Sequence, residues 1–475
     1  MGSPLTLNEH NFHEVMVASR RLLFHIPSSS LFEADAASAA VIEALRHGPL
    51  SPGELGRRLA GRMDGIEVEG VICDLQNLDI VSRDGAAAPA VFPAPAELPL
   101  TTVVLNVNTG CNLSCTYCYK EDLAAPADGE KMSLDTAVAS IEMLLAQSPE
   151  QPRYNIVFFG GEPLSNMALI REVVEYAEQR AAGLGKRIDF SLTTNATLLD
   201  ERTIRYLDSH HFGIAVSIDG PKAIHDRNRI TVGGQGTYET VARKVRLLLS
   251  LYRSRPVGAR VTLTRGITDL TAIWDHLFNE LGFAEVGFAP VTAGDIDHFN
   301  LTEGELAAVF DSMKALGRRY VEAALEHRTI GFSNLHQLLT DLHEGSKKAL
   351  PCGAGYSMVA VDKDGGVNLC HRFTGSELPT FGNVAEGLDV EALSGFLGRR
   401  LDRTDTGCAT CRIRNLCSGG CYHESYQRYN DPAMPVYHYC DLMRDWVDFG
   451  IEAYTRIAEG NPRFFDDYLS SRRAS

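Results

Sequence analysis

The stretch Asn108-Thr-Gly-Cys-Asn-Leu-Ser-Cys-Thr-Tyr-Cys-Tyr119 places three cysteines in one short loop, directly after the apolar, strand-like segment Val103 to Val107. The cysteines are Cys111, Cys115 and Cys118, with the spacing C-x-x-x-C-x-x-C. Three thiolates can hold a cube of four irons and four sulfides and leave one iron free to bind a small molecule. A structural zinc site is the alternative, but zinc prefers four ligands, usually in two paired hooks. The loop therefore indicates a catalytic iron-sulfur cluster.

Strand-like and helix-like segments alternate from Thr101 to Val291, which is the pattern of a parallel sheet. The predicted strands are Val103 to Val107, Asn155 to Phe159, Arg187 to Thr193, Gly213 to Ile218, Ala259 to Thr264 and Glu285 to Pro290. The predicted helices are Ser133 to Gln147, Met167 to Ala182, Glu201 to His210, Tyr238 to Tyr252 and Leu270 to Leu281. Six such units are too few to close an eight-stranded barrel, so we expect an open, partial (β/α)6 barrel with catalytic groups at the carboxyl ends of its strands.

Short polar side chains follow three of these strands. The second strand ends in Gly160-Gly161-Glu162-Pro163, the third in Thr193-Thr-Asn195 and the fourth in Ser217-Ile-Asp-Gly220. Glycines let backbone approach a ligand closely, and a glutamate can accept hydrogen bonds from an ammonium group. The other side chains suit hydroxyl groups and a carboxylate, although each could instead cap the next helix.

A second cysteine system occupies the carboxyl-terminal third of the chain. Its seven members are Cys352, Cys370, Cys408, Cys411, Cys417, Cys421 and Cys440. The first two stand in the pattern C-x12-G-x4-C with Gly365 as the glycine, and the next four have the spacing C-x2-C-x5-C-x3-C. A zinc ribbon is the alternative for the four closely spaced cysteines.

Residues 1 to about 90 form a separate small unit. Apolar, strand-like segments at Arg21 to Ile26 and Leu31-Phe32 precede a predicted helix from Ala36 to Arg46, a helix start at Ser51 and a third helix from Val68 to Leu78. Ile80-Val81 is a candidate wing, so the order is that of a winged helix. Seven arginines, no lysine and twelve acidic residues give this segment a net charge of -5, which would repel nucleic-acid phosphate. Such a unit is better suited to bind a peptide, which would add as a strand along an exposed sheet edge, than to bind nucleic acid.

Composition sets further limits. The net charge of -16 over 475 residues argues against a nucleic-acid or anionic-membrane partner, and no apolar run has the length of a signal peptide or a membrane span. We therefore expect a cytoplasmic enzyme. Ten of the eleven cysteines follow position 110, which in a reducing compartment indicates metal ligands rather than disulfides. Cys73 stands apart in an apolar helical pattern and is expected to be a buried, inert thiol.

The cysteine loop and strand-end motifs resemble those of the radical S-adenosylmethionine (SAM) superfamily. The resemblance implies a 4Fe-4S cluster on the three loop cysteines, whose free iron chelates the amino and carboxylate groups of SAM, and cleavage of SAM to a 5'-deoxyadenosyl radical. It also implies the SAM contacts. These are Gly160, Gly161 and Glu162 for the amino group, Thr193, Asn195 and Ser217 for the ribose and the carboxylate, Arg229 for the carboxylate, and Tyr117 for the adenine. A guanidinium matches a carboxylate bidentately, which suits the role of Arg229.

The seven later cysteines resemble the SPASM extension of peptide-modifying radical SAM enzymes, which carries two auxiliary 4Fe-4S clusters. Carried over by position, Cys408, Cys411, Cys417 and Cys440 hold one cluster, and Cys352, Cys370 and Cys421 hold the other. The second set is one thiolate short, because Gly353 to Met358 contains no cysteine. A non-cysteine ligand, an open iron or a ligand from the substrate remains possible. Our hypothesis is that a substrate cysteine completes the set and thereby has its thiol pKa lowered.

The full layout resembles a radical SAM maturase of peptides, with residues 1–95 as a winged-helix recognition element, 96–300 as the radical SAM core, 301–350 as a helical bridge and 351–475 as the SPASM domain. A linker from Gly85 to Pro99 separates the first two parts. The motif from Cys115 to Asp122 most resembles the family of quinohemoprotein amine dehydrogenase maturation proteins, which join cysteine sulfur to the methylene carbons of aspartate or glutamate in a small subunit.

That resemblance implies a small cysteine-containing substrate with a recognised leader, three 4Fe-4S clusters, SAM, and a flavodoxin- or ferredoxin-type reductant. Asp402 and Asp405, just before Cys408, are candidate bases for the thiol proton, although loop carboxylates are usually solvated. The alternatives are maturases that link carbon to carbon or sulfur to an α-carbon, an oxidase that converts cysteine to formylglycine as sulfatase maturases do, and an iron-sulfur redox regulator without enzymatic activity.

Overall fold

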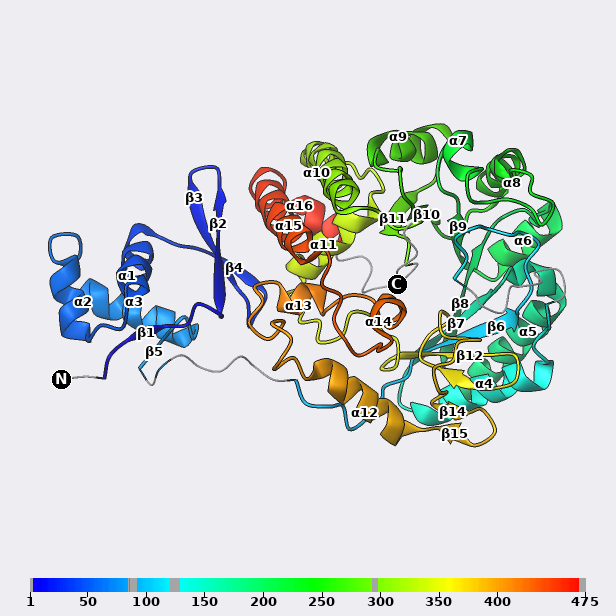
Figure 1. Ribbon diagram of the computed structural model, residues 1–475, viewed down its shortest axis with the longest axis horizontal. Coiled ribbons are helices and arrows are strands. Elements are labelled where there is room, and N and C mark those ends of the chain that lie inside the picture. Colours follow the sequence, from blue (N-terminus) through cyan, green and yellow to red (C-terminus); the bar gives the residue numbers. More distant parts are fainter. Residues whose placement is uncertain (1–2, 84, 86–91, 120–128, 293–297, 470–475) are drawn as a thin grey trace.

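A computed structural model describes residues 3–83, 85, 92–119, 129–292 and 298–469 of the chain. Part of the expected linker and the end of the motif from Cys115 to Asp122 lie outside the described residues. A small amino-terminal unit projects from a large curved body, whose strands lie on its inner side and whose helices α4, α5, α6 and α8 lie on its outer side (Figure 1). Among the described residues, no helix has the length and apolar character needed to cross a membrane.

The body is built on parallel strands that match all six strands predicted from the sequence within two residues. They are β6 (Thr102–Asn108), β7 (Arg153–Gly160), β8 (Arg187–Thr194), β9 (Gly213–Ser217), β10 (Val257–Leu263) and β11 (Glu285–Pro290). The intervening helices, which also match, are α4 (Leu134–Gln147), α5 (Met167–Leu184), α6 (Glu201–Ser209), α8 (Tyr238–Leu251) and α9 (Leu270–Trp274), which continues as the π-helical turn η4 (Asp275–Glu280). The short helices η3 (Pro163–Asn166) and α7 (Lys222–His225) follow β7 and β9.

Two further short strands extend this sheet from the carboxyl-terminal third of the chain. β12 (Met358–Val361) pairs in parallel with β6, and β13 (Val367–Asn368) pairs antiparallel with β12. The sheet therefore has eight strands in the order β11-β10-β9-β8-β7-β6-β12-β13. Because β12 and β13 lie between Cys352 and Cys370 and pair next to β6, they bring that cysteine segment to the sheet that carries the Cys111 loop.

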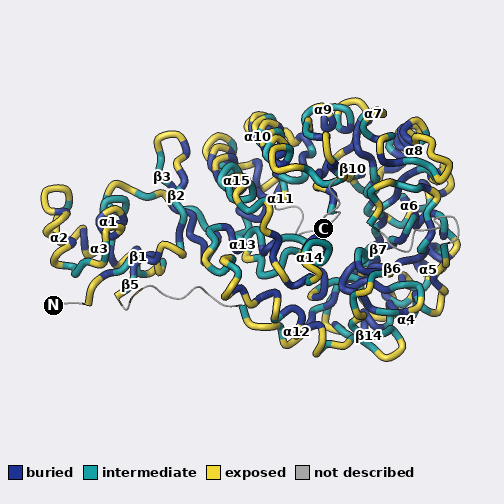
Figure 2. The backbone as a smooth tube through the Cα atoms, in the orientation of Figure 1, coloured by how far each residue is buried: buried dark blue, intermediate teal, exposed yellow. Residues whose placement is uncertain are grey.

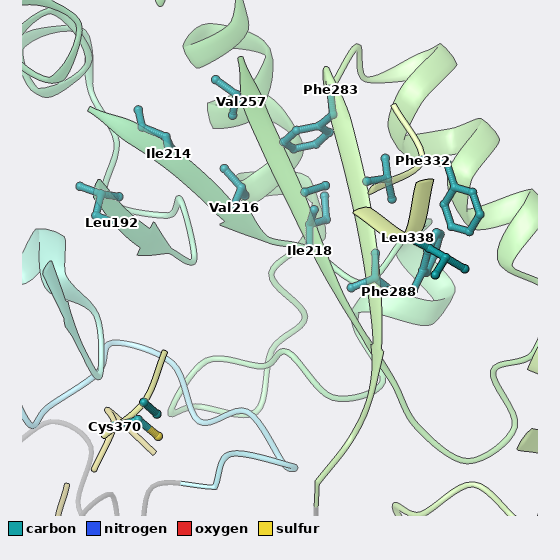
Figure 3. Packing of buried hydrophobic residues seen from close by; sticks show 14 of the residues in the cluster. Leu192, Ile214, Val216, Ile218, Val257, Phe283, Phe288, Phe332, Leu338 and Cys370 are labelled. Carbon is teal, nitrogen blue, oxygen red and sulfur yellow. The ribbon is translucent and has the colours of Figure 1, made fainter. Parts of the chain in front are cut away.

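Apolar side chains from successive strands fill the space between the sheet and its helices. Ile214 and Val216 on β9 lie close to Val257 at the start of β10, and Phe332 and Leu338 pack at the β11 side of the same cluster (Figure 3). Cys370 belongs to this cluster and is buried. The cysteine segment is thus anchored to a rigid core.

The remaining helices of the body pack beside β11. α10 (Glu303–Leu325), predicted as a bridge, begins at a capping box formed by Thr302 and Glu305 and packs with α11 (Ser333–His343) against α15 (Cys440–Gly460). The rest of the carboxyl-terminal segment consists of β14 (Gly382–Asn383), β15 (Gly387–Leu388), α12 (Val390–Leu401), α13 (Arg414–Cys417), α14 (Tyr422–Tyr429) and α16 (Arg463–Tyr468).

The amino-terminal unit has a three-stranded antiparallel sheet followed by three helices. Its elements are β1 (Thr6–Leu7), β2 (Phe12–Val17), β3 (Arg20–His25), β4 (Ser30–Glu33), α1 (Ala36–Arg46), α2 (Pro52–Leu59), α3 (Gly65–Asn77) and β5 (Val81–Ser82), which pairs with β1. The helices were predicted, but β2 was not. Cys73 is exposed rather than buried, because the apolar face of α3 consists of Val68, Ile72 and Leu75 and does not include it.

The hairpin of β2 and β3 is shared by two hydrophobic cores. Leu22 and Phe24 face the large core of the body, whereas Leu23 between them faces the small core of the amino-terminal helices, as the alternation of a strand requires. Asn415 Nδ2 donates to the Ile26 carbonyl at 2.7 Å, and β2 packs against α15. Buried residues run continuously from this hairpin into the body (Figure 2). The amino-terminal sheet is therefore an integral part of the packing around α15.

Candidate active site

A cavity of about 660 Å³ opens at the carboxyl ends of the parallel strands. All the residues predicted for the first cluster and for SAM line it. They are Cys111, Cys115, Cys118, Tyr117, Gly160, Gly161, Glu162, Thr193, Asn195, Ser217 and Arg229. Parallel strands present their carboxyl ends at one edge, which explains why motifs more than a hundred residues apart meet here.

Gly160 and Gly161 allow the cysteine loop to lie directly against β7. A Cβ on Gly161 would come within 2.1 Å of the Gly110 carbonyl oxygen, and one on Gly160 within 2.3 Å of the Asn108 carbonyl oxygen. The Gly161 amide donates to Asn108 at 2.8 Å. The lack of a side chain therefore lets the backbone of the cysteine loop approach β7, and both glycines also line the cavity where the cofactor contact is predicted.

Glu162 is a buried carboxylate held by three donors. Its Oε2 accepts from the Asn195 amide at 2.8 Å, and its Oε1 accepts from Thr194 Oγ1 at 2.7 Å and the Leu164 amide at 3.1 Å. Burial raises the pKa of Glu162 to about 7, although these hydrogen bonds oppose the rise. A cation in the cavity would favour its ionised form, as the predicted contact with an ammonium group requires.

Asp219 joins two predicted cofactor contacts in one buried cluster. It forms an ion pair with Arg229, with Nε 3.0 Å from Oδ2, and it accepts a hydrogen bond from Tyr117 Oη at 2.7 Å. The Thr262 amide donates to its Oδ1 at 3.0 Å. The sequence run Ser217-Ile-Asp-Gly220 contained Asp219, but its pairing with Arg229 was not predicted. Arg229 thus already has a carboxylate partner while it lines the cavity.

The thiols of the first loop are suited to bind the cationic core of an iron-sulfur cluster. Burial raises the pKa of Cys111 to about 12 and that of Cys115 to about 11. Cys111 Sγ accepts from the Leu113 amide at 3.4 Å and lies 3.8 Å from Asn195 Nδ2. Thiols in such a place become thiolates when metal supplies the compensating charge. The three side chains therefore fit a 4Fe-4S cluster on this loop.

Four of the later cysteines gather around a second cavity. Cys408, Cys411, Cys417 and Cys440 line a space of about 100 Å³, together with Arg403, Arg414 and Arg444. Among the described residues, no three His, Cys, Asp or Glu side chains converge closely enough for a single metal ion. Thiols spread around a cavity fit a cluster of several irons better than one zinc ion.

The remaining three cysteines lie near one another. Burial, together with the neighbouring thiols of Cys421 and Cys352, raises the pKa of Cys370 to about 12. The residue after Cys421 is Tyr422, which is buried and whose hydroxyl has no hydrogen-bond partner among the described residues. His371 and Arg372, which follow Cys370, line the 660 Å³ cavity, so this set lies beside that cavity.

The two candidate bases are placed elsewhere. Asp402 and Asp405 are exposed, and neither lines a cavity described above. Asp402 ends α12 and accepts from Thr404 Oγ1 at 2.7 Å, which lowers its pKa. Their closeness to Cys408 in sequence does not place them at the large cavity, because their side chains are exposed while the intervening Arg403 is buried.

Sequence reasoning missed several residues that line the large cavity or pack against its lining. The His371 ring lies 4.2 Å from the Phe159 ring, and the Arg372 guanidinium lies 4.5 Å from the Tyr119 ring. His423 packs on Tyr119 at 5.5 Å, and burial lowers its pKa to about 3, so it is neutral. In the sequence, Tyr119, His371, Arg372 and His423 follow Cys118, Cys370 and Cys421 within two positions, and this closeness to predicted cluster ligands could have indicated them.

Comparison with known proteins agrees with this site. The family model described as the Radical SAM superfamily matches residues 105–273. The cysteine-type anaerobic sulfatase-maturating enzyme of Clostridium perfringens (strain 13 / Type A) is 30% identical over 376 residues, which are 76% of this chain and 98% of that protein. A solved structure described as native anSMEcpe with bound AdoMet and Cp18Cys peptide has a TM-score of 0.63 at 21% identity, over 77% of this chain and 99% of that one. Streptococcus suis SuiB bound to precursor peptide SuiA has a TM-score of 0.50 at 14% identity, over 90% of this chain and 98% of that one.

The fold, the cavity and the family model together define a radical SAM enzyme. Within that superfamily, the chain belongs to the family of the anaerobic sulfatase-maturating enzymes.

Proposed function

We propose that this enzyme modifies a cysteine-containing polypeptide by radical chemistry, with SAM and three 4Fe-4S clusters as cofactors. The observation that carries the proposal is the single large cavity, whose wall runs from the Cys111 loop past Glu162 to His371 and Arg372 beside Cys370. Cluster and SAM together supply a 5'-deoxyadenosyl radical. The chain's residues place the cofactor at one end of the cavity and leave the other end for a substrate side chain.

Individual residues have distinct tasks in this proposal. Cys111, Cys115 and Cys118 hold the first cluster, and Glu162 accepts hydrogen bonds from the ammonium group of SAM. Arg229 and Tyr117, fixed by Asp219, border the carboxylate and the adenine. Cys408, Cys411, Cys417 and Cys440 would hold one auxiliary cluster. Cys352, Cys370 and Cys421 would hold another, and a substrate thiolate would complete this set of three ligands. Asp402 and Asp405 are not supported as bases by their exposed positions.

The relatives favour oxidation of a cysteine side chain as the reaction, because the Clostridium perfringens relative is a cysteine-type sulfatase-maturating enzyme. We place this oxidase first. Its match leaves about a quarter of the present chain uncovered, so the chain carries parts that this reaction does not require.

A thioether bond between cysteine sulfur and the methylene carbon of aspartate or glutamate is the second candidate, as in the small subunit of quinohemoprotein amine dehydrogenase. The observation that favours it is a pair of cations in the cavity, Arg260 and Arg372. Neither forms an ion pair with any carboxylate of the described residues, and Arg372 donates to Thr292 Oγ1. Guanidinium groups bind carboxylates well, so this pair would hold an acidic substrate side chain.

The amino-terminal unit would select the substrate through a leader peptide. β4 pairs only with β3 among the described strands, so its outer edge is open to strand addition. A flavodoxin- or ferredoxin-type protein would supply electrons, and the acidic charge of the chain leaves no role for nucleic acid or an anionic membrane.

Mass spectrometry after anaerobic turnover tests the proposal. The reconstituted enzyme, dithionite and SAM would be incubated with the dehydrogenase small subunit and, separately, with a sulfatase peptide that contains the target cysteine. Replacement of the sulfur of one cysteine by an aldehyde oxygen identifies the oxidase, whereas loss of two hydrogens with a cysteine that no longer alkylates identifies the thioether. The variant Cys115→Ala is the control and should give neither product. An enzyme that cannot cleave SAM under these conditions would contradict the proposal.

A further inference from the structure

The cavity of the Cys408 set is lined by cations, of which only Arg444 has a carboxylate partner among the described residues, Asp441. Arg403, Arg414 and Arg444 stand in its wall with the four cysteines, and no Asp, Glu or Lys of the described residues lines it. A fourth guanidinium, that of Arg400, lies behind Gly419 in the same wall. This composition is unusual for buried arginines, which are normally paired with carboxylates.

Arg400 occupies a site built to hold a guanidinium group. It is 2% exposed, and it donates to the carbonyls of Ala433 at 3.1 Å, Gly420 at 2.8 Å, Ser418 at 3.4 Å and Met434. Gly419 has a φ of +84°, and a Cβ there would lie 2.9 Å from Arg400 Nη2. The backbone is therefore shaped around the charge, but carbonyl dipoles supply no net negative charge.

Arg403 and Arg414 show the same arrangement. Arg403 is 7% exposed and donates to the Arg414 carbonyl at 3.1 Å and to the Ala349 carbonyl. Arg414 is 6% exposed and donates to the carbonyls of His10 at 2.7 Å and Cys411 at 3.4 Å. Neither of them, nor Arg400, forms an ion pair with a carboxylate of the described residues. Arg399, the surface residue directly before Arg400, differs in that it has a carboxylate partner, since its Nη2 lies 2.7 Å from Asp431.

Arg400 also reaches both sets of later cysteines. It donates to the carbonyl of Ser418, directly after Cys417 of the first set, and to the carbonyl of Gly420, directly before Cys421 of the second. Its guanidinium lies 5.2 Å from the ring of Tyr422, the residue that follows Cys421. Arg400 therefore contacts a cysteine-bearing segment of each proposed auxiliary cluster.

Thiolates and their cluster are the anions that such buried cations require. A 4Fe-4S cluster with four thiolates is anionic, and its negative charge grows by one on reduction. A fixed positive charge in a medium of low polarity stabilises the more negative, reduced form, because Coulomb interactions are only weakly screened there. Buried cations around a cluster thus raise its reduction potential.

We propose that Arg400, Arg403 and Arg414 are positioning residues that hold the reduction potential of the cluster at Cys408, Cys411, Cys417 and Cys440 high enough for it to accept the electron released in the reaction. The inference rests on the proposed function, because it requires a cluster on these cysteines. In the oxidase, a radical on the cysteine methylene carbon forms a second bond to sulfur, the sulfur-hydrogen bond breaks, and one proton and one electron leave. In the thioether reaction, a carbon radical joins a thiol, the carbon-sulfur bond forms, the sulfur-hydrogen bond breaks, and again one proton and one electron leave. The cluster takes the electron and is reduced by one unit, and the proton goes to solvent.

A redox titration followed by electron paramagnetic resonance tests this role on the full chain with its clusters assembled. Arg400→Met and Arg403→Met remove a charge but keep an unbranched side chain. Arg399→Gln is the matched control, since it removes a surface arginine next to Arg400 on α12. Addition of SAM shifts the signal of the first cluster and so separates it from the auxiliary signals.

The proposal expects a lower midpoint potential for one auxiliary cluster in both methionine variants, with unchanged iron content, and wild-type values in Arg399→Gln. Unchanged midpoints in variants that keep their iron would overturn it. If both variants lose iron, Arg414→Gln decides the matter, because Arg414 belongs to the proposed set, lies in the cavity wall and donates to two carbonyls, compared with four for Arg400. A lowered midpoint in that variant supports the proposal, and an unchanged one refutes it. Wild-type protein with iron for a single cluster would instead contradict the proposed auxiliary clusters themselves.

Discussion

Tyr117 Oη donates a 2.7 Å hydrogen bond to Asp219, and the same carboxylate is paired with Arg229. Asp219 is 1% exposed, and Arg229 is 7% exposed. The pair links the cysteine loop after β6 to the segment after β9, and the Thr262 amide connects it to β10. One carboxylate thus fixes two residues that border the proposed SAM site.

Asp219→Asn should destabilise the protein by about 3 kcal/mol, because it leaves the Arg229 guanidinium buried without a counter-charge. Denaturant unfolding of the apoprotein measures this change, and SAM binding should weaken in parallel. The control is Asp441→Asn, which removes a carboxylate whose side chain is 92% exposed and should change stability by less than about 0.5 kcal/mol. Equal effects of the two substitutions would show that the buried pair has no special role.

The raised pKa of Glu162 predicts that the affinity for SAM depends on pH. Its pKa of about 7 means that the carboxyl is increasingly protonated as the pH falls below 7, and the protonated form no longer attracts an ammonium group. Affinity for SAM should therefore fall on acidification, by up to about tenfold per pH unit below the pKa. Isothermal titration calorimetry between about pH 6 and pH 8 measures the slope. Glu162→Gln should bind SAM weakly at all of these values and lose the slope attributable to this residue, and a slope that persists unchanged would assign the effect to another group.

Gly161→Ala should disrupt the cysteine loop. The added methyl group would stand 2.1 Å from the Gly110 carbonyl oxygen, which is backbone and cannot move without shifting Cys111. We expect a loss of about 1–3 kcal/mol in stability, as for other overpacked sites, together with loss of SAM cleavage. Thermal unfolding and a cleavage assay check both. Gly183→Ala on α5 is the control, since a Cβ there meets nothing within 4 Å and should be neutral or stabilising.

Most of the parallel strands, and the strand-end residues that line the large cavity, could be predicted from the sequence for a physical reason. Long periodic segments such as Asn155 to Phe159 identify strands, and the carboxyl ends of parallel strands must meet, so Glu162 and Asn195 could be assigned to one site before any coordinates. β12 and β2 could not be predicted in this way, because neither has the pattern of a strand in the sequence. β12 is four residues long, and β2 carries polar residues that interrupt its apolar pattern.

Side-chain pairing could not be predicted in the same way. The partner of Arg229 is Asp219, ten positions earlier, and this pair depends on the fold of the segment between them. Closeness to Cys408 in sequence makes Asp402 and Asp405 candidate bases, but the structure shows both side chains exposed after the end of α12. Buried arginines such as Arg400 give no sequence signal, because surface arginines such as Arg399 look identical in sequence.

Iron content provides the last prediction, and it needs no substrate. Cys440→Ser should lower the iron of the reconstituted protein by about a third, because removal of one thiolate from the Cys408 set weakens one of three clusters and leaves the other two in place. Iron and sulfide analysis after anaerobic reconstitution measures the loss, and the SAM-dependent signal of the first cluster should remain. Cys73→Ser is the control, because Cys73 is an exposed thiol on α3 of the amino-terminal unit. If Cys440→Ser kept the full iron content while Cys417→Ser lost a third, Cys440 would not be a ligand, and the Cys408 set would need another fourth donor.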